Sequence, residues 1–87
     1  MVTIWKYEIY VVVAVQRFDM PVGSKVIKVG HQRKGILTFW ALVDPDLREM
    51  EVRQFRVLPT GGFVPDNCTY LGTCLDSELV WHLFEEI

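Results

Sequence analysis

Hydrophobic and polar residues alternate along most of this chain with a period of two. In residues 3–9, Trp5 and Tyr7 fall on one side and Lys6 and Glu8 on the other. Such alternation is typical of a β-strand with one buried face. Further strands are predicted over residues 10–18, 25–30, 36–43, 50–58 and 69–75. The segment 36–43, ILTFWALV, is the most apolar, and we expect it to lie centrally.

The run YVVVAVQRF, residues 10–18, contains three consecutive valines, at 11–13. Side chains branched at Cβ disfavour a helix, so the run predicts a buried or paired strand. Three segments between the strands have the composition of turns: DMPVGS, HQRKG and DPDLRE. HQRKG is predicted as a hairpin loop that ends at Gly35.

The C-terminal segment DSELVWHLFEEI fits two structures. Asp76 or Ser77 could cap a helix with Leu79, Leu83 and Ile87 on one stripe. Val80, Trp81, His82 and Phe84 suit a strand equally, because β-branched and aromatic residues pack well on a pleated sheet. We favour the strand and keep a short helix as the alternative.

Six or seven short strands predict an all-β fold, a small antiparallel sandwich or a partly open barrel. With 87 residues, the chain is expected to form a single domain over 1–87. A domain of this size cannot hide all its apolar surface when 51% of its residues are hydrophobic. We therefore expect a homo-oligomer.

The net charge of −2 argues against a binder of duplex DNA. Four basic residues nevertheless occur within ten positions that contain no acid: Lys25, Lys28, Arg33 and Lys34. They predict either a local basic site or ordinary solvated charge. Cys68 and Cys74 do not make a disulfide framework, and no leader or membrane-spanning segment is expected. We expect a soluble protein of a reducing compartment such as the cytoplasm, with no membrane partner.

The segment PTGGFVPDN, residues 59–67, offers the clearest candidate chemistry. Backbone N–H groups at Thr60, Gly61 and Gly62 could cradle an anion, although Pro-x-Gly-Gly also serves simply to reverse the chain. Arg53 and Arg56 lie upstream on opposite faces of one strand, so at most one of them can join the loop. An Arg fork beside backbone donors would suit phosphate.

Aromatic residues supply the second candidate chemistry. Phe63 or Trp40 could stack a base, although such residues more often anchor a core or an interface. His31, His82 and the two cysteines lack the spacing of a metal site, and no catalytic triad or nucleophile motif is present. We therefore expect a non-enzymatic protein with no cofactor and no metal.

The chain resembles a family of short uncharacterised proteins encoded largely by bacteriophages and prophages. The resemblance covers nearly the whole chain and rests on ordered pieces: TIWKY, MPVGSKVIKV, FWALVDP, FRVLPTGGFVP, YLGT and LVWHLFE. The family has Gly-Thr-Gly-His where this chain has Pro59 to Phe63, so the family's usual histidine is missing. The resemblance implies a strand over the C-terminal piece. It implies no established activity, because the family is a domain of unknown function.

The phage context that this resemblance implies favours a binding protein that acts against host defence. The leading hypothesis is a homo-oligomer that sequesters a small phosphate-bearing, nucleotide-like signal, such as a cyclic dinucleotide or an ADP-ribose derivative. The alternative is a protein–protein inhibitor of a host defence factor, or a phage structural or accessory module, that uses a strand edge or an aromatic patch.

Overall fold

The fold is all-β, as predicted. The computed structural model describes residues 1–12 and 14–87, apart from the side chain of Gln32. Its seven strands are β1 (Thr3–Tyr10), β2 (Gln16–Pro21), β3 (Lys25–Arg33), β4 (Ile36–Val43), β5 (Met50–Pro59), β6 (Cys68–Asp76) and β7 (Leu79–Glu86). The described residues contain no helix, so the C-terminal segment is the favoured strand and the helix alternative is wrong.

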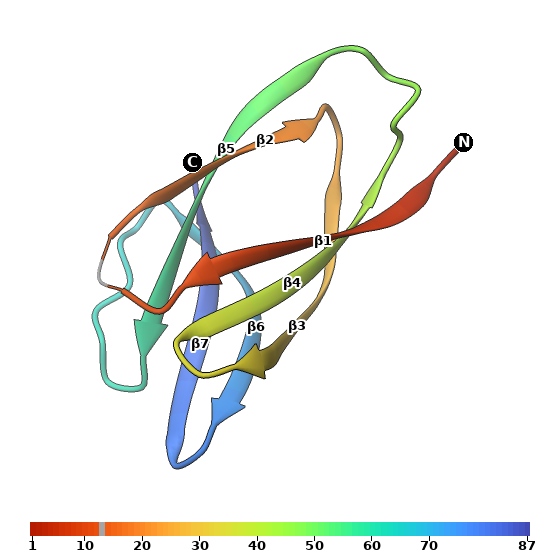
Figure 1. The fold of residues 1–87 in the computed structure, drawn as a ribbon. Coiled ribbons are helices and arrows are strands. Elements are labelled where there is room, and N and C mark those ends of the chain that lie inside the picture. The colour runs from red at the N-terminus through yellow and green to blue at the C-terminus, as the bar shows by residue number, and fades with distance from the viewer. Residues whose placement is uncertain (13) are drawn as a thin grey trace.

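The strands form two antiparallel sheets, shown in Figure 1. One has the order β1-β4-β3 and the other the order β2-β5-β7-β6. The sheets make an open sandwich, which confirms the predicted class. β3 of one sheet packs beside β6 of the other, where the backbone of Gly72 meets the side chain of Val29. No helix in the described part of the chain is long and apolar enough to span a membrane.

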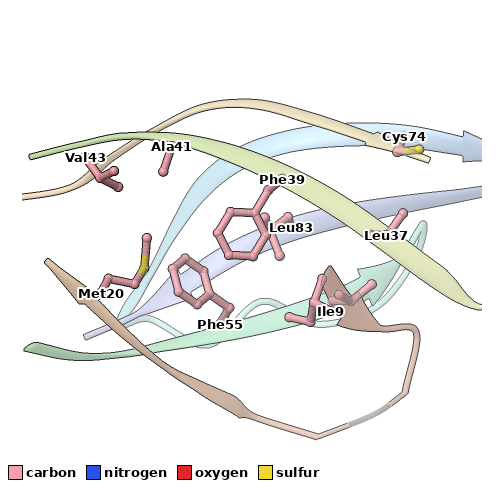
Figure 2. Close-up of a cluster of buried hydrophobic side chains, with 10 residues drawn as sticks. Ile9, Met20, Leu37, Phe39, Ala41, Val43, Phe55, Cys74 and Leu83 are labelled. Atoms are coloured by element: carbon pink, nitrogen blue, oxygen red, sulfur yellow. The ribbon is translucent and has the colours of Figure 1, made fainter. Parts of the chain in front are cut away.

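Alternation along the central strands places the core between the two sheets. β4 contributes Leu37, Phe39, Ala41 and Val43 to the core, and Figure 2 shows them facing Phe55 of β5 and Leu83 of β7. Phe39 is the centre of an aromatic cluster. Its ring centroid lies 5.2 Å from that of Tyr7 and 4.8 Å from that of Phe55. The most apolar segment of the sequence is therefore the central strand of its sheet, as expected.

The single strand expected over residues 10–18 is wrong. β1 ends at Tyr10 in one sheet, and β2 begins at Gln16 in the other. The N–H of Val11 donates to the carbonyl of Gly35, and that of Val12 to the carbonyl of Tyr10, at 3.0 Å each. A corner must bend the backbone away from one ladder, and this requirement overrides the strand preference of valine. Val13, part of the predicted run, lies outside the described residues.

The hairpin loop HQRKG is shorter than expected. His31 and Arg33 still pair with Leu37 and Ile36, so β3 continues to Arg33. Only Lys34 and Gly35 form the turn, and Gly35 has the positive φ of 79° that makes glycine favourable there. A register shift between His31 and Arg33 absorbs the extra residue.

Candidate functional site

The Thr-Gly-Gly segment after β5 forms a tight turn. The N–H of Gly62 donates to the carbonyl of Pro59 at 3.0 Å, and Gly61 has φ of 89°. A positive φ at the third of four residues is the signature of a type II β-turn, which glycine favours. One of the three N–H groups proposed for an anion cradle is therefore occupied by the turn itself. The segment therefore forms the chain-reversing turn that Pro-x-Gly-Gly also predicts.

The turn also lines a surface cavity of about 250 Å³. Thr60, Gly61 and Gly62 contribute to its wall, so the structure brings these three predicted residues together. The wall is otherwise Leu58, Pro59, Val64, His82 and Phe84. No Lys or Arg of the described chain lines it, so the cavity offers a phosphate no permanently charged side chain.

His82, which has no metal-site or catalytic spacing in the sequence, is a functional group of this cavity. Its Nε2 lies 2.9 Å from the Thr60 hydroxyl, and its Nδ1 lies 2.9 Å from the Thr73 hydroxyl. The Thr73 hydroxyl in turn lies 2.6 Å from the Tyr70 hydroxyl. Both ring nitrogens thus have partners in a chain of four side chains. Antiparallel pairing of β7 with β5 and β6 brings them together, and no local sequence spacing reveals it.

Arg53 does not reach the cavity at the turn. Its Nε and Nη2 donate to the two carboxylate oxygens of Glu85 at 2.6 and 2.7 Å, and its Nη1 donates to the carbonyl of Ser24. The hydrogen bonds with Glu85 raise the pKa of Arg53, against a smaller lowering by burial. The guanidinium of Arg53 is therefore already bound by the carboxylate of Glu85.

Arg56 lies on the opposite face of β5, as its position in the strand predicts. Its Nε and Nη2 donate to Oε1 of Glu86 at 3.1 and 2.8 Å. Arg56 is therefore also held by an acid, and it does not line the cavity at the turn. The structure does not bring either arginine to the Thr-Gly-Gly turn.

The two predicted stacking residues lie in different places. Phe63 is 97% exposed at the loop after β5 and contributes nothing to the wall of the cavity. Trp40 belongs to β4, in the other sheet. The predicted combination of loop, arginine and aromatic side chain is thus not assembled around one cavity.

Trp40 has a different set of neighbours, on the outer face of the three-stranded sheet. The register places it between Lys6 of β1 and Lys28 of β3. Residues directly opposite in adjacent strands project from the same face. The indole ring lies against the backbone of Gly30, where an added Cβ would be 3.0 Å from Cζ3. A partly exposed indole therefore lies along the sheet beside two lysines.

This face, which we call the Trp40 face, is also the most basic part of the molecule. The strand positions that project from it carry Lys6, Lys25, Lys28 and Arg33, against the single acid Glu8. Arg33 and Glu8 pair at 3.5 Å. The chain as a whole has eleven acids and nine bases, so positive charge is concentrated on this sheet. Most of the basic stretch seen in the sequence thus joins Trp40 rather than the turn.

Comparison with known proteins identifies the family and leaves the activity open. No curated protein and no solved structure matches the chain. One family, described as a domain of unknown function (DUF7352), matches residues 1–87. The chain therefore belongs to the DUF7352 family over its whole length.

Proposed function

We propose that this protein binds a small anionic, nucleotide-like ligand on the Trp40 face and does not turn it over. The observation that carries the proposal is the cross-strand row Lys6–Trp40–Lys28 with the indole laid against Gly30. An indole face stacks on a base, and an ammonium on either side attracts phosphate.

The glycine at position 30 supports this assignment. A side chain there would push against Cζ3 and Cη2 of Trp40, so its absence lets the ring lie along the sheet. Lys25 and Lys28 are exposed and have no ion pair among the described residues. Their charge is thus available to a ligand, unlike that of Arg53 and Arg56. In the proposed complex, lysines rather than arginines therefore contact the phosphate.

The resemblance to phage and prophage proteins extends the proposal to biology. A phage protein that holds a cyclic dinucleotide or an ADP-ribose derivative would remove a host alarm signal without any chemistry. Such a counter-defence protein must be present in stoichiometric excess over the signal. A small domain that is quickly made suits that requirement.

Calorimetric titration with ADP-ribose and with a cyclic dinucleotide tests the proposal. Trp40→Ala should weaken binding by about 5- to 150-fold, because stacking on an aromatic residue contributes roughly 1–3 kcal/mol per base. Gly30→Ala should weaken it less, by tilting the ring. Lys28→Gln should lower the affinity and its salt dependence, whereas the matched control Lys34→Gln, in the β3–β4 turn, should not.

Two results would overturn the proposal. One is the absence of binding for both probes at high protein concentration. The other is unchanged affinity in folded Trp40→Ala protein. A single-stranded oligonucleotide belongs in the same titration series, since tighter binding of the polymer would replace a small signal by nucleic acid as the ligand.

A second candidate function, inhibition of a host protein, is favoured by Phe63. This ring is 97% exposed and Val64 beside it is 47% exposed. Exposed aromatic residues are frequent anchors of protein interfaces. Recovery of a polypeptide from host lysate by the wild-type protein, with loss of that polypeptide in Phe63→Ser, would support this function over ligand capture.

A further inference from the structure

β1 leaves one edge of the three-stranded sheet open. It pairs with β4 on one side, and none of the other described strands packs along its second side. The opposite edge of this sheet, β3, is packed beside β6. The remaining edge strand, β2, carries Arg17 and Asp19 and ends in Pro21. Proline protects an edge against pairing, and β1 has no proline along its eight residues, although it carries the opposite charges of Lys6 and Glu8.

The hydrogen bonds at the end of β1 reveal which of its backbone groups point outward. The N–H of Val11 donates to Gly35, on the side of β4. The N–H of Tyr10 donates to Oε1 of Gln16 at 3.0 Å, and the Nε2 of Gln16 donates to the carbonyl of Tyr10 at 2.8 Å. Along an antiparallel strand, the backbone N–H and C=O groups of successive residues point alternately toward and away from the paired strand. Those of Tyr10 point away from β4, so the backbone groups of Glu8, Lys6 and Ile4 point away from β4 as well.

The side chain of Gln16 therefore occupies the last outward position and leaves the preceding ones for another strand. Apolar side chains flank this row and are strongly exposed. Val2 is 60% exposed, Ile4 55% and Tyr10 64%. An open row of backbone donors and acceptors flanked by exposed apolar groups is a surface for strand addition.

We infer that the open edge of β1 pairs with β1 of a second copy in an antiparallel register centred on Tyr7. In this register Lys6 lies opposite the partner's Glu8, and Glu8 lies opposite the partner's Lys6. Ile4 lies opposite the partner's Tyr10, whose outward backbone groups remain bonded to Gln16, so these two residues meet through their side chains alone. The outward groups of Lys6 and Glu8 supply the central ladder of hydrogen bonds. The interface is self-complementary, as a two-fold axis requires.

The charges of Lys6 and Glu8 favour this register over one that is shifted by two residues. A shift of two residues would place Lys6 opposite the partner's Lys6 and bury Ile4 against the partner's Glu8. Like charges directly opposite one another destabilise a sheet, and unlike charges stabilise it. A shift by one residue would set outward groups against inward ones and lose the ladder. The register centred on Tyr7 avoids both problems.

The dimer joins two sheets into one with the order β3-β4-β1-β1-β4-β3. Its two-fold axis is perpendicular to the sheet, so both Trp40 faces project from the same side. The two indoles would be about 16 Å apart, from three strand spacings of roughly 4.8 Å across the sheet and a two-residue offset of roughly 6.8 Å along it. The pairing nevertheless does not depend on ligand binding, and the two proposals are tested by different residues.

Charge exchange at Lys6 and Glu8 tests the register. In Lys6→Glu protein, position 6 would oppose the partner's Glu8, and in Glu8→Lys protein, position 8 would oppose the partner's Lys6. Each single variant should dissociate at least about tenfold more readily than the wild type, which corresponds to 1.4 kcal/mol. An equimolar mixture of the two single variants should form a heterodimer, because both contacts become attractive. The double variant should recover the homodimer.

Sedimentation velocity over a concentration series measures these equilibria, and thermal unfolding shows whether each variant is folded. Lys34→Glu is the matched control, since position 34 lies in the β3–β4 turn away from the edge. A wild type that stays monomeric throughout the series would overturn the inference. Single variants that dimerise as well as the wild type would overturn it too, as would a mixture that forms no heterodimer.

Discussion

The guanidinium of Arg53 and the carboxylate of Glu85 form a two-point hydrogen-bonded pair between β5 and β7. The distances are 2.6 Å from Nε to Oε2 and 2.7 Å from Nη2 to Oε1. A third contact runs from Nη1 to the carbonyl of Ser24, the residue that immediately precedes β3. The side chains are only 15% and 19% exposed. Arg53 thus joins both sheets at one end of the core, and its role is structural.

Breaking this pair should destabilise the protein. Glu85→Gln removes the two-point counter-charge of the mostly buried Arg53 and leaves only Glu51, 3.9 Å from Nη1, so we expect a loss of about 2–3 kcal/mol in the free energy of unfolding. The double variant Arg53→Met with Glu85→Leu should be close to the wild type, because no buried charge remains. Urea denaturation measures each value. Arg17→Gln, on the exposed outer face, is the control and should change stability by less than about 0.5 kcal/mol.

The contact between β3 and β6 should be intolerant of a larger residue at position 72. A Cβ on Gly72 would lie 2.5 Å from Cγ2 of Val29, so the sheets must separate to admit it. Gly72→Ala should lower the free energy of unfolding by about 1–3 kcal/mol. Combining it with Val29→Ala should cost less than the sum of the two single changes. Strict additivity in urea denaturation would contradict the close approach.

The stability cost of a substitution in the turn at Thr60–Gly62 should depend only on how well the new residue adopts the backbone conformation of the turn. Gly61 has φ of 89° and open space around its Cα. Gly61→Ala should therefore cost about 1 kcal/mol, and Gly61→Asn should cost less, because asparagine tolerates this region better. The order of the two denaturation midpoints is the readout. Equal midpoints for both variants would exclude a type II turn in solution.

Both thiols should react slowly at neutral pH. Burial raises the pKa of Cys74, and burial together with the nearby Glu86 raises that of Cys68. A raised pKa means less thiolate at pH 7, and the thiolate is the reactive form. The rate of modification by a chromogenic disulfide should rise steeply toward pH 9 and should be much faster in urea. Rapid modification of the folded protein at pH 7 would contradict this expectation.

Strand positions were predictable where turn residues bounded a short alternating or apolar run. The segment 36–43 became β4 without a change of boundary, because an apolar run of this length between two turn segments is typical of a buried strand. The end of β1 at Tyr10 and the start of β2 at Gln16 were not predictable. Valine prefers a strand wherever its neighbours permit, and only the position of the second sheet requires a bend there.

The candidate site was also predictable only in part. Residue types pointed correctly to a turn at Thr60–Gly62, but the sequence does not show that Arg53 and Arg56 each meet a glutamate some 30 positions away. It also does not show that His82 lies between two threonine hydroxyls. These are cross-strand relationships fixed by register.

By itself, the sequence determined that this protein is an antiparallel all-β domain with an apolar centre, because hydrophobic period and turn chemistry act over a few residues, and it left a sandwich and a partly open barrel as alternatives. The tertiary structure alone decided which charges are already neutralised by a partner and which remain beside Trp40. It also decided which strand is left at an edge. Those outcomes depend on how strands far apart in the chain are aligned, and local composition carries no information about that alignment.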